Sequence, residues 1–269
     1  MRSDHGGRHE LGQNFLHHPP TVRRVVDLVA DACGPILELG AGDGALTVPL
    51  SRLGRPLTAI ELDEHRARRL AARLPAVRVR RADALTVPLD APVVVGNVPF
   101  HLTTPILRRL LDDDSWQHAV LLTQWEVARK RAGVGGRTLL TAQSDPWVAA
   151  SLHGRVPAEA FRPRPGVDGG LLVLRRRERP LVPVSERRRY REFVRQVFQG
   201  RGRGIGQILG GRAGGELRRL GVPSSALPRE LTPEQWAGLW AAVGRRAAPV
   251  GAARGRPGER GRPRGGWRA

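Results

Sequence analysis

The 269-residue sequence contains a single cysteine, Cys33, and no long uninterrupted apolar run. One cysteine excludes an internal disulfide and any cysteine-rich metal site. No apolar run approaches the roughly 20 residues that a helix needs to cross a bilayer. The amino-terminal segment is charged and glycine-rich, and it lacks the apolar core of a signal peptide. We therefore expect a cytoplasmic protein with no bound metal and no membrane contact.

Lysine is also nearly absent, because Lys130 is the only one. Basic residues nevertheless number 45 against 25 acidic ones, which gives a net charge of +20 and an isoelectric point near 11.8. The arginine guanidinium is a planar fork that grips phosphate with two hydrogen bonds. Genomic base composition could explain the choice of arginine over lysine, but not the excess over acid. The charge predicts a polyanionic partner, with nucleic acid as the leading candidate.

The first two thirds of the chain alternate short apolar runs with helical patterns. This alternation predicts an α/β fold with a mostly parallel sheet covered on both faces. Such sheets bind ligands outside the carboxyl ends of their strands. The predicted strands are 35–39, 57–62, 77–81, 92–96, 119–123, 147–156 and 170–174.

Composition divides the chain into three predicted parts. Residues 1–179 form the α/β part, and residues 180–247 form a helical part. Its last helix is predicted to begin at Thr232, the first residue of a capping box, and to place Trp236 in the core of a small bundle. Residues 248–269 are rich in arginine and glycine and are predicted to be disordered. This tail either adds nonspecific RNA affinity or is simply solvated, and the sequence leaves both open.

Glycines and acids follow the first three predicted strands. Gly40 and Gly42 close the first strand and would let a ligand approach the backbone. Glu61 and Asp83 end the next two strands, where acids can hold ribose hydroxyls and an adenine amine. Taken singly, each acid could instead cap a helix. As a set, they predict a nucleotide site that is compatible with either a dinucleotide or S-adenosylmethionine.

The fourth predicted strand ends in Asn97-Val98-Pro99-Phe100. The Asn97 amide oxygen and the Val98 carbonyl are hydrogen-bond acceptors, and Pro99 restricts the backbone so that both can converge. Phe100 adds a flat apolar face. The alternative is an ordinary turn between a strand and a helix. Because it follows the glycines and acids of the predicted nucleotide site, the tetrapeptide predicts a pocket for the exocyclic amine of an aromatic base.

Such a pocket can activate an adenine N6. This nitrogen is a poor nucleophile because its lone pair is delocalised into the ring. Two acceptors that hold its hydrogens out of the plane favour a pyramidal nitrogen, which can attack a sulfonium methyl group. The nitrogen loses its proton afterwards, so catalysis would come from positioning and electrostatics.

These motifs resemble those of the erythromycin-resistance (Erm) rRNA adenine-N6 methyltransferases, relatives of the small-subunit rRNA dimethyladenosine transferases. The resemblance extends over about residues 10–247. Val98 and Phe100 are mild departures, since isoleucine or leucine and tyrosine are more usual there. The matching segments are Gly12-Gln13-Asn14-Phe15-Leu16, Glu38-Leu39-Gly40-Ala41-Gly42-Asp43-Gly44, Asn97-Val98-Pro99-Phe100, Gln124-Trp125-Glu126-Val127-Ala128-Arg129 and Phe161-Arg162-Pro163-Arg164-Pro165-Gly166-Val167.

The resemblance implies a Rossmann-like, S-adenosylmethionine-dependent methyltransferase domain over residues 1–179 and a small helical RNA-binding domain over 180–247. It implies that Glu61 holds the donor's ribose, that Asp83 holds its adenine, and that Phe100 stacks on a flipped target adenine. The implied cofactor-binding residues are Asn14, Leu16, Gly40, Gly42, Glu61, Asp83, Ala84 and Asn97. The implied catalytic residues are Asn97, Val98, Pro99, Phe100 and Phe161.

The implied acceptor is an adenine in a single-stranded or loop region of 23S rRNA, and the implied biology is resistance to macrolides, lincosamides and streptogramin B. A monomer is expected. Three other functions stay open on the residues alone. These are a nicotinamide-dependent oxidoreductase, a noncatalytic RNA-binding protein and a DNA adenine methyltransferase.

Overall fold

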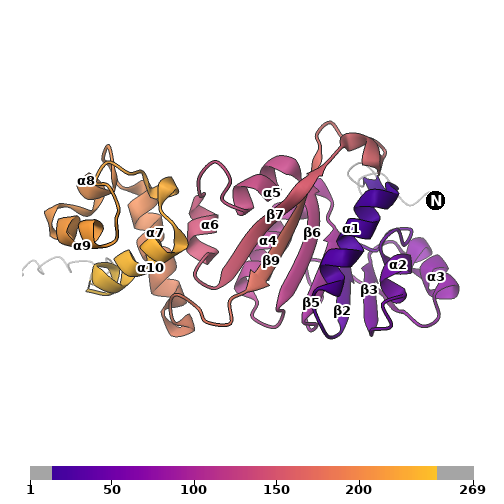
Figure 1. The fold of residues 1–269 in the computed structure, drawn as a ribbon. Helices are drawn as coiled ribbons and strands as arrows, with labels where there is room; N and C mark the ends of the chain where they lie inside the picture. The colour runs from indigo at the N-terminus through magenta and orange to yellow at the C-terminus, as the bar shows by residue number, and fades with distance from the viewer. Residues whose placement is uncertain (1–13, 247–269) are drawn as a thin grey trace, which may run out of the picture.

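The computed structural model describes residues 14–246. A broad sheet flanked by helices occupies most of the molecule, and the helices of residues 187–242 lie together at one end of it (Figure 1). The predicted tail at 248–269 and the first two residues of the amino-terminal motif, Gly12 and Gln13, lie outside the described residues.

All seven predicted strands are confirmed, with ends within about two residues of the prediction. They form one sheet in the order β4-β3-β2-β5-β6-β9-β7. Neighbours from β4 to β6 are parallel, whereas β9 is antiparallel to both β6 and β7. The strands are β2 (Ile36–Leu39), β3 (Leu57–Glu61), β4 (Arg78–Arg81), β5 (Val93–Asn97), β6 (His118–Gln124), β7 (Val148–Val156) and β9 (Gly169–Arg176).

The central strands are apolar throughout because both of their faces are buried. Successive side chains of a strand point to opposite faces. In β5, Val93 and Val95 join the core beneath α1, whereas Val94 joins the core on the other face with Leu110 and Trp116. A run of three valines is therefore what this position in the sheet requires.

Helices cover both faces of the sheet. The first begins with Pro19 and buries Val25, Leu28 and Val29 against one face. No helix in residues 14–246 has the length and apolar character needed to cross a membrane. The helices beside the sheet are α1 (Pro19–Ala30), α2 (Thr47–Ser51), α3 (Glu64–Arg73), α4 (Thr103–Asp112), α5 (Trp125–Arg131) and α6 (Leu139–Ser144).

Two very short strands were not predicted. β1 (Phe15–Leu16) pairs antiparallel with β8 (Phe161–Arg162), so that Leu16 lies opposite Phe161. Two residues are too few to show an alternating pattern. The pairing joins two of the segments that match the family, the amino-terminal one and the one that begins at Phe161.

The carboxyl-terminal part of the described chain is helical, as predicted. The Thr232 side chain accepts a hydrogen bond from the Gln235 N–H, and Gln235 reciprocates to the Thr232 N–H, which completes the expected capping box. Trp236 is fully buried and contacts Phe193 edge to face. The prediction of a tryptophan core is therefore confirmed. The helices are α7 (Arg187–Gln199), α8 (Ile205–Leu209), α9 (Gly214–Arg219) and α10 (Pro233–Ala242).

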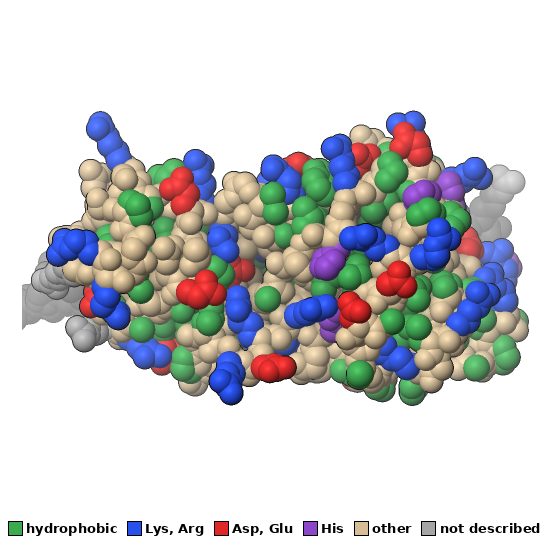
Figure 2. All heavy atoms as spheres, viewed as in Figure 1, with side chains coloured by type: hydrophobic (Ala, Val, Ile, Leu, Met, Phe, Trp, Pro, Cys, Tyr) green, Lys and Arg blue, Asp and Glu red, His purple; other side chains and the backbone are tan. Residues whose placement is uncertain are grey.

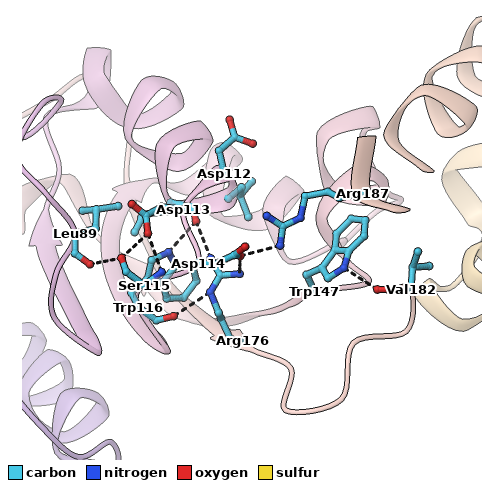
Figure 3. Close-up of polar contacts among 12 residues, drawn as sticks. Leu89, Asp112, Asp113, Asp114, Ser115, Trp116, Trp147, Arg176, Val182 and Arg187 are labelled. Atoms are coloured by element: carbon cyan, nitrogen blue, oxygen red, sulfur yellow. Dashed lines mark hydrogen bonds and ion pairs between the residues drawn. The ribbon is translucent and has the colours of Figure 1, made fainter. Parts of the chain in front are cut away.

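An ion-pair cluster joins α7 to the sheet. Asp114, just after α4, accepts from Arg176 of β9 at 2.6 Å and from Arg187 of α7 at 2.7 Å. The Arg187 guanidinium also lies over the Trp147 ring, 5.1 Å from its centre (Figure 3). The Trp147 indole N–H in turn donates to the Val182 carbonyl. The helical part is thus fixed to the α/β part by charge as well as by a continuous apolar core.

Candidate active site

The glycine loop follows β2 and turns sharply at the carboxyl edge of the sheet. The N–H groups of Gly40 and Ala41 both donate to the Ile60 carbonyl at 2.9 Å, which holds the loop against β3. Gly42 has a φ of +57°, and a Cβ there would lie 3.2 Å from the Phe15 ring. A side chain at this position would be strained and crowded, so glycine is required for the turn.

Glu61 and Asp83 stand beside this loop. The buried Glu61 carboxylate accepts from the N–H of Gly42 at 2.7 Å and from the N–H of Asp63 at 2.9 Å. Asp83 Oδ1 accepts from the Leu85 N–H at 2.8 Å, and Oδ2 has no hydrogen bond within residues 14–246. A carboxylate has about four acceptor sites, so each side chain keeps capacity for a ligand's hydroxyl or amine.

Asn97 ends β5 and is oriented by the amino-terminal segment. Its Nδ2 donates to the Asn14 carbonyl at 2.7 Å. A carbonyl can only accept, so this bond determines which end of the amide is NH₂. The Oδ1 atom is consequently the end left to accept from a substrate.

The next two residues present a second acceptor. The buried Val98 donates its N–H to the Leu122 carbonyl at 3.0 Å, and its own carbonyl accepts no hydrogen bond within the described chain. Pro99 follows with φ −51° and ψ 132°, an extended conformation that leads into the turn Phe100–Leu102. Two acceptors from consecutive residues at the end of β5 therefore have no partner within residues 14–246.

The two aromatic residues assigned to catalysis lie together but differ in exposure. Phe100 and Phe161 meet edge to face, with ring centres 6.1 Å apart and planes at 72°. Phe100 is half-buried, whereas only 1% of Phe161 is exposed. In this structure Phe161 packs against Phe100 and has no free face of its own.

One cavity of about 230 Å³ brings the other site residues together. It opens at the carboxyl ends of β2, β3 and β5, where the chain order switches from one side of β2 to the other. Ligands of doubly wound sheets bind at this kind of position. Phe100 and Phe161 are not among its lining residues. The predicted residues that line it are Asn14, Leu16, Gly40, Gly42, Glu61, Asp83, Ala84, Asn97, Val98 and Pro99.

Glu38 also lines the cavity, although no role was expected for it from the sequence. It is 1% exposed, and its Oε2 atom is buried without a partner among the described residues. Burial raises the pKa of Glu38 to about 8, opposed in part by the adjacent Thr47 and reinforced by the Glu61 carboxylate. One feature of the sequence could have indicated this role, because Glu38 is the single acid in the otherwise apolar strand Ile36–Leu39. His101, which the sequence analysis did not assign to the site, also lines the cavity.

This set of groups fits S-adenosylmethionine. The donor combines a cationic sulfonium and ammonium with a ribose and an adenine. The cavity offers the orphaned Glu38 oxygen, the Glu61 carboxylate, the Asp83 carboxylate and a glycine loop without side chains. Acceptors and negative charge suit the donor's cationic and hydrogen-bonding groups.

Comparisons with known proteins agree with the motifs. The model of the ribosomal RNA adenine dimethylase family matches residues 4–236. The chain is 51% identical over 207 residues to an rRNA adenine N-6-methyltransferase of Corynebacterium diphtheriae, covering 76% of this chain and 82% of that protein. It is 48% identical over 266 residues to the mycinamicin-resistance protein MyrB of Micromonospora griseorubida, covering 94% and 86%.

A solved structure confirms the fold class. The crystal structure of the 23S rRNA methyltransferase ErmE matches with a TM-score of 0.77 and 32% identity, over 85% of this chain and 99% of that one. Of the functions left open by the residues, only the rRNA adenine methyltransferase is supported by these relatives. The resemblance drawn from the motifs is therefore confirmed, and the chain belongs to the ribosomal RNA adenine dimethylase family.

Proposed function

We propose that this protein transfers methyl groups from S-adenosylmethionine to N6 of one adenine in 23S rRNA, and that the modified base confers macrolide, lincosamide and streptogramin B resistance. Family membership makes the chain an rRNA adenine methyltransferase. The finer proposal is supported by the relatives ErmE, named for 23S rRNA, and MyrB, named for mycinamicin resistance. We further propose that it acts as a cytoplasmic monomer.

One observation carries the proposal. The Asn97 amide is turned by its bond to Asn14, so that Oδ1 and the unpaired Val98 carbonyl are the acceptors left at the end of β5. These two oxygens suit an amino group that carries two hydrogens. A hydroxyl, which carries a single hydrogen, would leave one of them unsatisfied, at a cost of about 1–3 kcal/mol.

When bound, S-adenosylmethionine supplies an electrophilic methyl carbon. In the proposed arrangement Glu61 binds its ribose hydroxyls, Asp83 binds its adenine amine, and the glycine loop leaves room for its methionine part. Glu38 Oε2 accepts a hydrogen bond from the ammonium group of S-adenosylmethionine. These contacts hold the donor in the cavity that Asn97 borders, and their orientation reduces the entropy cost of the reaction.

The acceptor base is proposed to stack on Phe100, with its N6 hydrogens directed at Asn97 Oδ1 and the Val98 carbonyl. This geometry draws both hydrogens away from the ring plane and exposes the nitrogen lone pair. Phe161 supports Phe100 through their edge-to-face contact. Extrusion of the base costs least in a loop or single strand.

The division of the chain is part of the proposal. Residues 1–179 bind the donor and carry out the transfer, and residues 180–247 contribute RNA contacts. Support comes from the placement of the cavity entirely within the first part and from the basic character of the second. Arg129, Lys130 and Arg131 of α5 are further candidates for phosphate contacts.

The test uses purified protein, S-adenosylmethionine and protein-free 23S rRNA, followed by digestion to nucleosides and mass spectrometry. We expect N6-methyladenosine or its dimethyl form with the wild type, and neither with Asn97→Ala. Small-subunit rRNA and DNA serve as parallel acceptors. Methylation of one of these alone would contradict the 23S assignment, and absence of donor binding by calorimetry would contradict the choice of S-adenosylmethionine.

A further inference from the structure

A second hollow, of about 550 Å³, lies in the helical part of the molecule between α8 and α9. It is separate from the donor cavity, with which it shares no lining residue. Its polar side chains belong to Arg203, Gln207, Arg218, Ser224 and Ser225. None of the described residues that line it is acidic or aromatic, so it suits neither a cation nor a stacked base.

The segment that forms this hollow is strongly basic. Residues 200–229 contain six arginines and one acid, Glu216. Glu216 is paired with Arg219 at 2.8 Å, on the helix that also carries Arg218. Within residues 14–246, the guanidinium groups of Arg203 and Arg218 have neither an ion pair nor a hydrogen bond. Arginine side chains project from this end of the molecule (Figure 2).

Glycines shape the hollow in two ways. At Gly204 and Gly206 a Cβ would lie 2.5 and 2.7 Å from atoms of Ser224, so these glycines let the loop that carries Ser224 pack directly on α8. At Gly210 and Gly211 a Cβ would meet nothing within 4 Å. The backbone there faces open space, which a ligand can approach closely.

We propose that this hollow binds phosphodiester groups of the RNA substrate, at a distance from the adenine being methylated. Arg203 and Arg218 supply guanidinium forks for phosphate oxygens, and Gln207 and Ser224 add neutral hydrogen-bonding groups. Because no aromatic ring is present, the contact is to the backbone and positions the RNA without reading its sequence. The identity of the RNA rests on the proposed function, whereas the phosphate site rests on the hollow itself.

The first test measures affinity for a 23S rRNA fragment as a function of salt, with no methyl transfer required. Each phosphate contact contributes roughly 0.7 to the slope of log affinity against log salt for a single strand. We therefore expect the double variant Arg203→Ala/Arg218→Ala to lower the slope by about 1.4 and to bind at least about 10-fold more weakly at low salt. The control double variant is Arg52→Ala/Arg68→Ala, which removes two exposed arginines at the opposite end of the molecule.

A second test leaves every arginine in place and changes a glycine instead. Gly211 has no positive φ, and a side chain there meets open space, so Gly211→Glu folds normally and places a carboxylate at the hollow. We expect this variant to weaken RNA binding by about 10-fold, while the isosteric neutral variant Gly211→Gln has a smaller effect. S-adenosylmethionine affinity is unchanged in both.

The outcomes separate the two proposals. If the variants of the hollow bind RNA more weakly but the wild type does not methylate 23S rRNA, the phosphate site is supported and the proposed function is overturned. Normal methylation of 23S rRNA would overturn the phosphate site if all variants of the hollow kept the wild-type RNA affinity and the wild-type slope of log affinity against log salt. An equal loss in the Arg52/Arg68 control would assign the effect to net charge and also overturn it. Inorganic phosphate is the last probe: binding that disappears in Arg203→Ala/Arg218→Ala, with unchanged RNA affinity, would identify a free-anion site instead.

Discussion

The side-chain amide of Asn97 donates to the backbone carbonyl of Asn14, 2.7 Å away and 83 positions earlier in the chain. This one bond orients the amide at the end of β5. It also ties the amino-terminal segment to the sheet beside the β1–β8 pair. The active-site geometry therefore depends on a segment that precedes the first helix.

Replacing Asn97 by alanine removes both the bond to Asn14 and the Oδ1 acceptor. We expect methyl transfer to 23S rRNA to fall by at least about 100-fold, the scale of loss when an oriented polar group at a reacting centre is removed. RNA affinity and the melting temperature are expected to change little, because Asn97 is not part of the apolar core. Methyl incorporation, RNA binding and thermal melting are measured on the same preparation. A parallel loss of RNA binding and of folded protein would show that Asn97 supports the fold instead.

Asp83→Asn keeps an oxygen for the Leu85 N–H but removes the negative charge. We expect S-adenosylmethionine to bind about 10-fold more weakly, since an amide oxygen is a weaker acceptor than a carboxylate for the donor's amine. Calorimetry with the donor alone measures the effect. Asp90→Asn, an exposed acid outside the cavity, is the control. Unchanged affinity in Asp83→Asn would remove Asp83 from the donor site.

Glu38 is expected to make stability depend on pH. Its pKa is raised from 4.5 to about 8 in the folded chain, mainly by burial. Below pH 4.5 the Glu38 carboxyl is protonated in both the folded and the unfolded chain. As pH rises toward 8, the unfolded chain loses this proton and the folded chain keeps it. Folding stability is therefore reduced progressively, by an amount on the order of a few kcal/mol.

Glu38→Gln removes this dependence because glutamine stays neutral. We expect the variant to gain stability relative to the wild type as pH rises from about 5 to about 8.5, measured by urea unfolding without donor. Glu178→Gln, at an exposed position, is the control. A constant difference between variant and wild type over this range would contradict the raised pKa.

Asp114 joins α7 to the sheet, and its pKa is lowered, chiefly by the hydrogen bond from Arg187. A lowered carboxylate pKa contributes stability above the unfolded value of 3.8, and this contribution is lost as pH falls through the folded value. The Asp114 side chain is 49% exposed, so solvent screening limits the effect of Asp114→Asn to about 1 kcal/mol. Thermal melting at pH 7 measures it, and we expect the difference from wild type to shrink in high salt. A difference that is insensitive to salt would point to packing and not charge.

The motifs predicted much of the site because they occupy strand ends. Glu61 and Asn97 close parallel neighbours of β2, so a correct list of strands places both at the same edge of the sheet. The capping box at Thr232 was predictable for a similar reason, since all of its hydrogen bonds lie within four consecutive residues.

Contacts between distant segments could not be predicted in this way. Nothing near Phe161 indicates that β8 pairs with β1 or that the ring is buried against Phe100. The insertion of β9 between β6 and β7 likewise follows from long-range pairing.

The sequence by itself determined the α/β class, the strands and the residue types of the site, because apolar spacing and turn chemistry act within a few residues. Only the tertiary structure decided which oxygen of Asn97 faces the substrate, that Glu38 is a buried acid with an unpaired oxygen and a raised pKa, and that Arg203 and Arg218 share a hollow. Each of these depends on burial or on a partner far along the chain. Local pattern carries no information about either.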